Sequence, residues 1–279
     1  MRRACLFVLV CVSLVVTGSK SGGQTEQPKF DPVGLQSKRG YFAQLPFESV
    51  DMVNGNLILT FTDLVLPGNA GMDLRIVRSY NHQAIGFKWS FGFAGVPLWI
   101  EQPEHLSLEL PWEPAAVTAD GNRHRLYGSP TSEYLYTSSF WRYHRATRTL
   151  ELPNGWVATY ETLSGLGVAM LNEVRDPFGN ALEPDWEGGE PADLRPLRLL
   201  GVTQTSYGIG ADWSRTVTFT YPTGHFSRMP ETMTYDGRIW TYTEGVCCVP
   251  GTEQRLLTSV DAPGDVGGNW AIRLRLQRS

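Results

Sequence analysis

Apolar and polar residues alternate along most of the interpretable segments of this chain. The alternation runs through residues 57–62, 72–77, 141–144, 216–221 and 239–243. A period of two residues is typical of a strand with one buried face, and the β-branched and aromatic residues in these segments suit a pleated sheet. No apolar stripe of helical period extends over twelve residues after residue 23. The pattern therefore predicts an all-β chain.

Short turn signals of one kind separate the alternating segments. An Asp or Asn close before a Gly readily supplies the positive φ angles that tight hairpin turns require. Turns of this type contain Asp120-Gly121, Asn154-Gly155, Asp176 with Gly179, and Asp236-Gly237. After three of these glycines a tyrosine follows at the fifth or sixth position, which makes a weak internal repeat. Single hairpins cannot bury an apolar face alone, so the repeat predicts an antiparallel sheet of stacked hairpins.

The composition agrees with frequent turns and limits the partners. The chain has 279 residues with 29 glycines, 18 prolines and 11% aromatic residues, which is long enough for one large domain or two smaller ones. The formal net charge is -4, and only 19% of the residues are charged. These values exclude a basic nucleic-acid binder that works by counterion release, and they argue against a disordered polyelectrolyte.

The first 23 residues have the three parts of a secretory signal peptide. A basic start at Arg2 and Arg3 precedes an apolar run, Ala4–Val16, and a stretch of small and polar residues. The apolar run is shorter than the roughly 20 residues of a transmembrane helix. Removal of residues 1–23 takes three positive charges and no negative charge, which changes the net charge from -4 to -7. We expect an exported protein without an integral membrane span, located outside the cell, on its surface or in the periplasm; an uncleaved anchor is the alternative.

Two adjacent cysteines, Cys247 and Cys248, remain after removal of this leader. A disulfide between neighbours closes a strained small ring, so a vicinal disulfide, free thiols and intermolecular pairing all stay open. Two adjacent thiolates without a nearby His or further Cys lack the usual spacing of metal ligands. The sequence predicts neither a metal site nor a cofactor.

Several separated motifs occur in order between residues 46 and 81. An Asn-Gly-Asn-Leu strand start is followed by an aspartate, a Leu-Pro-Gly turn and an Arg-x-Tyr-Asn strand end. This order resembles the opening module of the RHS/YD-repeat protein family. The resemblance places the structural motif of this module at Asn54, Gly55, Asn56, Pro67, Gly68, Tyr80 and Asn81.

Three later segments, 174–180, 234–242 and 257–264, are similar to individual YD repeats. Tyr235-Asp236 is the dipeptide that gives these repeats their name, and Gly237 follows it directly. With these repeats, the resemblance covers about residues 40–270. It implies an amino-terminal β module at 46–164 and a degenerate YD-repeat region at 165–279. Before them we expect the signal peptide at 1–23 and an extended arm at 24–45, because the residues after the leader are polar and contain Pro and Gly.

The resemblance implies a long β-sheet that spirals into a hollow shell, of which this chain would form the open start. Because the chain has only a few repeats, we expect a short relative or an amino-terminal fragment of such a shell. The implied function is that of a non-catalytic, exported structural or interaction protein, as the shell part of a secreted toxin or of a cell-surface contact protein. The expected partners are a further RHS/YD-repeat chain, an encapsulated protein or a cell-surface glycan, but no nucleic acid.

Two other functions compete with this interpretation. A carbohydrate-binding β module would stack sugars on indole faces, although tryptophan in alternating strands is more often core; the candidates are Trp99, Trp112, Trp141, Trp156 and Trp240. A glycoside hydrolase-like enzyme would need two carboxyl groups within about 10 Å of each other, from candidates such as Glu101, Glu104 and Glu109. No nucleophile elbow, zinc-protease motif, P-loop or dinucleotide fingerprint occurs, and His124 and His144 are expected on a solvated sheet face. We therefore expect no catalysis.

Overall fold

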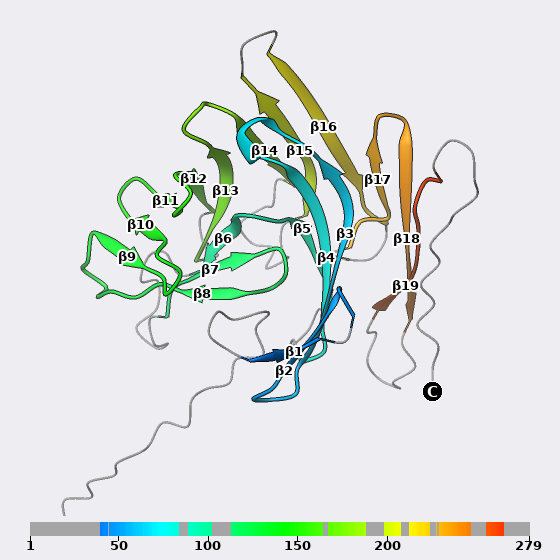
Figure 1. Ribbon diagram of the computed structural model, residues 1–279, viewed down its shortest axis with the longest axis horizontal. Coiled ribbons are helices and arrows are strands. Elements are labelled where there is room, and N and C mark those ends of the chain that lie inside the picture. The colour runs from blue at the N-terminus through cyan, green and yellow to red at the C-terminus, as the bar shows by residue number, and fades with distance from the viewer. Residues whose placement is uncertain are drawn as a thin grey trace, which may run out of the picture. The chain divides into compact units, whose positions relative to one another are not determined.

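The computed structural model describes residues 40–43, 45–83, 89–101, 113–163, 167–187, 198–207, 212–223, 227, 229–246 and 255–264. All of these belong to one unit, Pro32–Ser279. They form nineteen strands and a 3-10 turn, η1 (Asn69–Gly71), and every strand pair is antiparallel (Figure 1). The prediction of an all-β, antiparallel chain is confirmed. The predicted signal peptide, most of the predicted arm, Cys247 and Cys248 lie outside the described residues.

The first sheet runs in chain order, so each strand pairs with the next. It contains β1 (Tyr41–Phe42), β2 (Glu48–Asp51), β3 (Leu57–Leu66), β4 (Leu74–Asn81) and β5 (Trp89–Phe93). β3 and β4 form a long hairpin whose register shifts between Thr62 and Leu64. This irregularity places Asp63 at a break in the regular pairing of the two strands.

The second sheet is wound mostly in chain order. Its strands are β6 (Pro97–Glu101), β7 (Ala115–Thr118), β8 (Arg123–Arg125), β9 (Tyr134–Tyr136), β10 (Arg142–His144), β11 (Thr149–Glu151), β12 (Val157–Leu163), β13 (Val168–Arg175), β14 (Ala181–Trp186), β15 (Leu199–Ser206), β16 (Trp213–Thr220), β17 (Thr232–Tyr235), β18 (Arg238–Val246) and β19 (Arg255–Asp261). From β9 to β19, each strand pairs with its successor, which is the arrangement predicted for stacked hairpins. Among the described strands, β19 has β18 as its only partner.

A second group of strands joins this sheet at β13. β12 pairs with the whole length of β13 on one side. On the other side, the start of β13 pairs with β6 through Val168–Met170, and its end pairs with β14 through Val174 and Arg175. β6 continues to β7 and β8, and two backbone hydrogen bonds of 2.7 and 3.0 Å between Tyr127 and Tyr136 link the chain after β8 to β9. The sequence pattern does not predict this branch.

The boundary between the two sheets differs from the boundary predicted between modules. The first sheet ends with β5 at Phe93, and the second begins with β6 at Pro97. β12 and β13 pair with each other across the predicted boundary between residues 164 and 165. The modules 46–164 and 165–279 therefore share one sheet, and their division remains a prediction from the resemblance.

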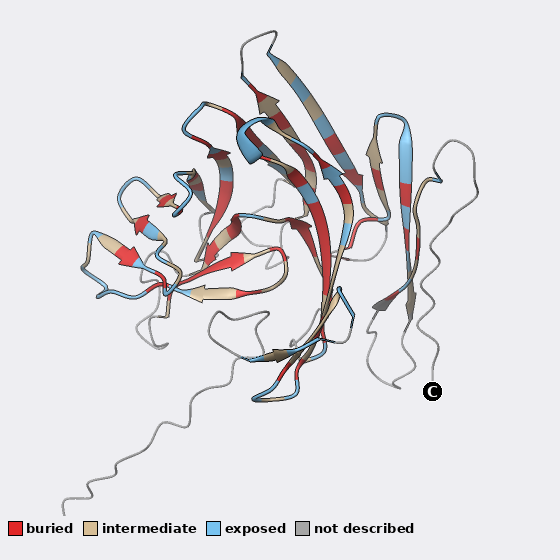
Figure 2. Cartoon of the chain, in the orientation of Figure 1, coloured by how far each residue is buried: buried red, intermediate tan, exposed pale blue. Residues whose placement is uncertain are grey.

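Both sheets contribute to one contiguous apolar core. β16 alternates between exposed and buried positions, whereas β4 is buried almost throughout because it is covered on both faces (Figure 2). Phe91 of β5 makes edge-on ring contacts with Phe219 of β16 and Tyr242 of β18, at centroid distances of 5.0 and 5.8 Å. These rings connect the first sheet to the strands of the second.

Candidate functional site

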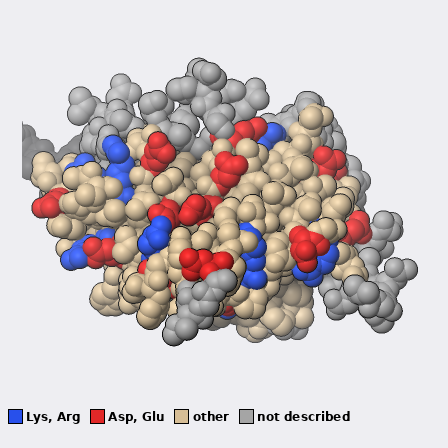
Figure 3. All heavy atoms as spheres, turned by 90° about the horizontal axis from the view of Figure 1, so that it is seen from above, with Lys and Arg blue, Asp and Glu red and all other residues tan. Residues whose placement is uncertain are grey.

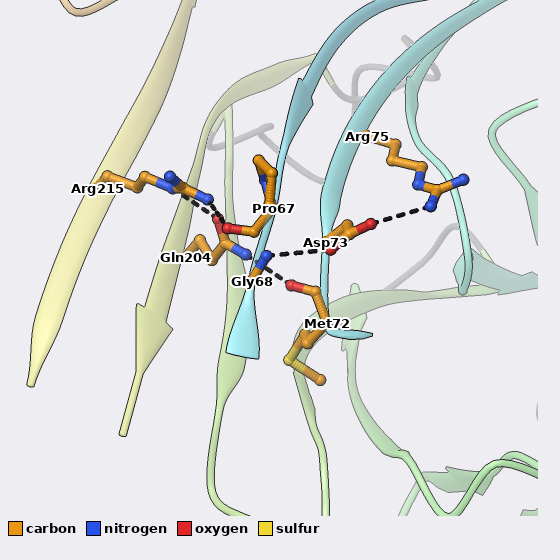
Figure 4. Close-up of polar contacts among 7 residues, drawn as sticks. All are labelled: Pro67, Gly68, Met72, Asp73, Arg75, Gln204 and Arg215. Carbon is orange, nitrogen blue, oxygen red and sulfur yellow. Dashed lines mark hydrogen bonds and ion pairs between the residues drawn. The ribbon is translucent and has the colours of Figure 1, made fainter. Parts of the chain in front are cut away.

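A group of polar contacts, which we call the inter-sheet clasp, holds the turn between β3 and β4 against β15 and β16. The clasp consists of Pro67, Gly68, Met72, Asp73, Gln204 and Arg215 (Figure 4). The first four residues come from the turn, whereas Gln204 lies in β15 and pairs with Arg215 in β16. Pro67 and Gly68, two residues of the predicted motif, are therefore brought to the junction of the two sheets.

Gln204 is central to the clasp because its side chain bonds in two directions. It is only 1% exposed. Its Nε2 donates to the carbonyl oxygen of Met72 at 2.6 Å, and its Oε1 accepts a hydrogen bond from Nε of Arg215 at 2.8 Å. Nη2 of Arg215 also donates to the carbonyl oxygen of Pro67. Because an unbonded buried amide is costly, these contacts favour one arrangement of the turn on β15.

Position 68 requires glycine because neighbouring atoms lie close to its Cα, and not because of its backbone angles. The φ of -114° and ψ of 169° lie in the extended region that is open to any residue. A Cβ at Gly68 would lie 2.0 Å from the carbonyl oxygen of Met72 and 2.5 Å from Nε2 of Gln204. Only glycine lets the turn approach Gln204 closely enough for the clasp to form.

A carboxylate at the surface completes the turn. The N–H of Gly68 donates to Oδ1 of Asp73 at 3.1 Å, and Oδ2 of Asp73 pairs with Nη2 of Arg75 at 2.9 Å. The hydrogen bond from Arg75, followed by that from Gly68, lowers the pKa of Asp73. Asp73 therefore stays charged at neutral pH and keeps its bond to the turn.

The predicted turn at Asp176 is anchored to the end of β15. Oδ1 of Asp176 accepts hydrogen bonds from the N–H groups of Phe178 and Asn180, both at 2.9 Å, and its Oδ2 accepts one from Nδ2 of Asn180 at 2.7 Å. Oδ1 of Asn180 then accepts from Oγ of Ser206 at 2.9 Å and from the N–H of Tyr207 at 2.8 Å. The carbonyl oxygen of Tyr207 accepts a hydrogen bond from the β3–β4 turn. The structure therefore links the Asp176 motif to the β3–β4 turn that carries the clasp.

Four hairpins of the second sheet share one turn geometry. In each, the first residue exchanges backbone hydrogen bonds with the fourth and fifth residues, and the fourth residue has a positive φ. The turns are 118–122, 137–141, 152–156 and 176–180, with Gly121, Phe140, Gly155 and Gly179 at the fourth position. The pattern matches a type I turn followed by a left-handed residue, a conformation that glycine adopts without strain. The turn with Phe140 has no glycine and is missed by the sequence prediction.

The Tyr235-Asp236-Gly237 sequence forms the turn between β17 and β18. Tyr235 pairs directly with Arg238. Between them, Asp236 and Gly237 have φ angles of 50° and 71°. A two-residue hairpin with two positive φ angles is a type I′ turn, which Asp-Gly favours. In this chain the YD dipeptide thus shapes the backbone, while Tyr235 packs its ring 5.6 Å from the guanidinium carbon of Arg238.

The Asn-Gly-Asn motif and the Tyr-Asn motif meet at Gln83. Asn54 and Gly55 form the turn before β3, where Gly55 has a φ of 71° and Oδ1 of Asn54 accepts from the N–H of Asn56 at 2.9 Å. Oδ1 of Asn56 and Oδ1 of Asn81 each accept a hydrogen bond from the N–H of Gln83 at 3.1 Å. The two motifs therefore fix the same end of the β3–β4 hairpin.

A buried ion pair, which the sequence interpretation does not single out, connects the first sheet to β18. Nη1 of Arg78 and Oδ1 of Asp63 lie 3.3 Å apart, with 5% and 6% of their side chains exposed. The hydroxyl of Tyr242 donates to Oδ2 of Asp63 at 3.0 Å. Burial raises the pKa of Asp63, while Arg78 and Tyr242 act in the opposite direction, and burial also raises the pKa of Tyr242. The sequence does contain a signal for this pair, because Asp63 and Arg78 both belong to the motifs that resemble the opening module.

An apolar cavity of about 110 Å³ adjoins this ion pair. Its lining comes from both sheets and consists of Phe47, Leu59, Phe61, Arg78, Trp89, Leu257, Thr258, Ser259 and Val260. The guanidinium carbon of Arg78 lies 4.5 Å from the ring centroid of Phe61, and Tyr80 of the predicted motif packs its ring 5.3 Å from that of Trp89. Because the lining atoms are almost all apolar, this cavity is suited to packing rather than to proton transfer.

The candidate residues for carbohydrate binding and for catalysis that lie in the described ranges make packing or ion-pair contacts. Glu101 accepts hydrogen bonds from Nε of Arg123 at 2.7 Å and from Nε1 of Trp99 at 3.4 Å. Of the candidate tryptophans, Trp240 is buried, and three others are partly buried and pack against the core: Trp99, Trp141 and Trp156. Glu104, Glu109 and Trp112 lie outside the described residues.

The two histidines expected on a solvated sheet face differ in their surroundings. His124 turns its ring toward Trp141, at a centroid distance of 4.2 Å. Burial lowers the pKa of His124, and Asp120 opposes this effect. His144 stacks on Tyr134 at 4.7 Å. His124 is therefore a neutral packing residue at pH 7.

The described residues meet the requirements neither of a membrane-spanning helix nor of a metal site, and the surface charge on one face is mixed. Within the described ranges, no helix has the length and apolar character that crossing a bilayer requires. No group of three His, Cys, Asp or Glu residues with the arrangement of metal ligands occurs in that part of the chain either. On the face shown in Figure 3, positive and negative side chains are interspersed, and neither sign covers a large continuous area.

Comparison with known proteins adds a family match and a structural likeness. No curated protein matches the sequence. Among solved structures, the chain is similar to the N-terminal domain of effector protein SpvB from Salmonella typhimurium strain LT2, with a TM-score of 0.32 and 13% identity over 72% of this chain and 93% of that chain. Residues 47–110 match the family described as Domain of unknown function (DUF6531), a span that includes β2 to β6 and lies within the predicted amino-terminal module.

Proposed function

We propose that this chain is a non-catalytic, exported structural and interaction protein, built like the start of an RHS/YD-repeat shell, in a secreted toxin or a cell-surface contact protein. One observation carries the proposal: the motif residues shape turns and join the two sheets. Gly68 makes room for the inter-sheet clasp, Asp176 holds Asn180, whose side chain bonds to Ser206 of β15, and Asp236 with Gly237 closes a hairpin. Residues used in this way serve architecture rather than chemistry.

The order of strands in the second sheet supports a shell of stacked hairpins. From β9 to β19, each strand is added beside the one before it. Among the described strands, the far side of β19 has no pairing, and an unpaired strand edge offers N–H and C=O groups to a further strand. A further RHS/YD-repeat chain would pair at this edge, and an encapsulated protein would contact the inner face of the resulting shell.

The amino-terminal sequence supports export. Its basic start, apolar run and small polar residues have the pattern of a cleavable leader. The protein would then act outside the cell, on the cell surface or in the periplasm. The hydrogen bonds that Glu101 accepts from Arg123 and Trp99 favour a structural role for that carboxylate over acid–base catalysis.

Hydrogen-exchange mass spectrometry on the full-length exported protein tests the proposal, with and without a purified array of consecutive YD repeats. We expect slower amide exchange in β19 when the array is present, because new strand pairing protects the edge. β1, at the edge of the other sheet, serves as the control and should be unchanged.

Two results would overturn the proposed function. The first is unchanged exchange in β19 at saturating concentrations of the repeat array. The second is release of reducing sugar from a polysaccharide panel, above the level of heat-denatured protein, since that would make the chain a glycosidase.

A further inference from the structure

Three aromatic side chains stand in solvent at one end of β9. Tyr127 is 55% exposed, Tyr136 50% and Phe140 86%. Tyr127 and Tyr136 pair directly with each other, so their side chains share one face of the sheet. Phe140 follows in the turn that joins β9 to β10. We call these three residues, together with Arg125 and Arg142, the aromatic face.

Two arginines accompany the exposed rings. Arg142 of β10 lies directly opposite Tyr136, on the side away from Tyr127. Arg125 stands two residues before Tyr127 and places its guanidinium carbon 5.6 Å from the centroid of that ring. The described residues provide Arg125 with no ion-pair partner. Tyrosine and arginine together on a surface are typical of binding sites.

Phe140 distinguishes this face from an ordinary sheet surface. The equivalent position is glycine in the other three turns of this geometry, but Phe140 has a φ of 63°. A Cβ in the left-handed region is strained, and an exposed ring gains nothing from burial. Stability of the fold therefore does not explain Phe140. Strained residues concentrate at sites that contact a ligand or partner.

The local charge narrows the choice of ligand. Residues 123–151 contain five arginines and two glutamates, although the whole chain has a net charge of -4. The positive excess is modest, because Arg123 pairs with Glu101 and Arg142 pairs with Glu151. Flat rings beside a modest positive charge suit a sparsely charged polymer better than the dense phosphates of nucleic acid.

We propose that the aromatic face binds an acidic polysaccharide whose sugars carry carboxylate groups. The three rings stack on the C–H faces of successive sugars and Arg125 pairs with a carboxylate, while Arg142 keeps its ion pair with Glu151 beside the bound chain. Neighbouring strands lie about 4.8 Å apart, which is close to the length of one sugar unit. The spacing of Tyr127 and Tyr136 therefore matches the repeat of such a polymer. This inference rests on the proposed exported interaction role and adds a ligand to it.

Isothermal titration calorimetry of the full-length exported protein with alginate oligosaccharides tests this binding. We expect Phe140→Gly and the double substitution Tyr127→Ser, Tyr136→Ser each to weaken binding at least tenfold. The matched control is Phe178→Ala, which removes a 72% exposed phenylalanine from the equivalent turn 176–180 and should leave the affinity unchanged. Phe140→Gly should not lower the midpoint of thermal unfolding, because glycine relieves the strained φ, so its loss of binding cannot come from unfolding.

Each contrary result has a defined meaning. Wild-type affinity in Phe140→Gly, or no binding of alginate at all, overturns the proposal. Equal binding of neutral dextran contradicts the role of the carboxylates, and tighter binding of heparin or single-stranded DNA assigns the face to a sulfated chain or to nucleic acid instead. If the protein shortens the alginate, the proposed non-catalytic function is wrong, but the binding site stands. If β19 shows no slower amide exchange with the repeat array, the proposed shell function is wrong, and the alginate site is again unaffected.

Discussion

Glycines serve two different purposes in the motifs of this protein. Gly55 and Gly237 have positive φ angles, and no neighbouring atom lies within 4 Å of the place where a Cβ would stand. Gly68 has an extended backbone, but its missing Cβ leaves room for Met72 and Gln204. A side chain therefore strains only the local backbone at Gly55, whereas at Gly68 it separates the turn from β15.

Gly68→Ala should lower the free energy of unfolding by about 2–4 kcal/mol, because the added methyl group overlaps two atoms of the clasp. Gly55→Ala, the control, should cost about 1 kcal/mol for its left-handed backbone alone. Denaturant titration followed by tryptophan fluorescence measures both changes. Equal losses in the two variants would show that the clasp contributes nothing beyond the turn.

His124 should make stability depend on pH in a predictable direction. Burial lowers the pKa of His124 below its usual 6.5, so the folded state binds a proton less readily than the unfolded chain. The stability that the neutral ring contributes is therefore present above pH 6.5 and is lost as the pH falls through 6.5 toward the folded pKa. Unfolding free energies of the wild type and His124→Gln, measured between about pH 5 and 8, should converge on acidification. Parallel curves would disprove this role.

Local pattern predicts the individual hairpins of the second sheet better than it predicts how they meet. Asp236-Gly237 forms its turn as expected because the φ angles of a two-residue hairpin depend on those two residues. The turn at Phe140 escapes prediction because its sequence lacks the glycine that marks the others. The pairing of β6 with β13 is also not predicted, because the pairing of two strands far apart in the sequence depends on how their side chains pack in the folded protein and leaves no local sequence signal.

Tyr160 ties β12 to the start of β6. Its buried hydroxyl donates to the carbonyl oxygen of Pro97 at 3.0 Å, and burial keeps the pKa of Tyr160 high, so the donor persists at alkaline pH. Tyr160→Phe leaves that carbonyl without its hydrogen bond and should lower the free energy of unfolding by about 1–2 kcal/mol. Tyr207→Phe, at an exposed position, should change it by no more than about 0.5 kcal/mol. Chemical denaturation compares the two variants, and a loss at Tyr160 no larger than that at Tyr207 would contradict the assignment.

Over the whole molecule, contacts between distant residues hold the two sheets together. The resemblance singles out Pro67 and Gly68 as motif residues, and the structure places them on one side of the clasp. The resemblance does not predict Gln204 or Arg215 on the other side, since the strands that carry them show only the alternation common to every strand. Tyr242 belongs to the predicted repeat after Gly237, but that pattern does not indicate its bond to Asp63.

Arg78→Met should lower the free energy of unfolding by about 3–5 kcal/mol at neutral pH, because it leaves the Asp63 carboxylate buried without its cation. The pKa of Asp63, already raised by burial, then rises further, so the folded state takes up a proton more readily than the unfolded chain. The loss of unfolding free energy in Arg78→Met relative to the wild type should therefore become smaller as the pH falls toward 3.8. Denaturation of the wild type, Arg78→Met and the double variant Asp63→Leu, Arg78→Met across this range tests the expectation. A loss independent of pH, or a double variant no more stable than Arg78→Met, would contradict it.

The junction at β13 also affects the order in which the chain folds. Glu101 of β6 pairs with Val168 of β13, and all the strands from β7 to β12 lie between them in the sequence. Closing this long loop costs more entropy than closing the short hairpins between β9 and β13, so we expect pulse-labelled amides of those hairpins to gain protection first and the amides of the β6–β13 pairing to gain it last. Simultaneous protection would disprove this order. During synthesis from the amino terminus, β6 exists for a long interval before β13, its second partner beside β7, is made. Its apolar residues and open edge are then available to other chains, which makes premature aggregation at this strand the main kinetic hazard of the fold.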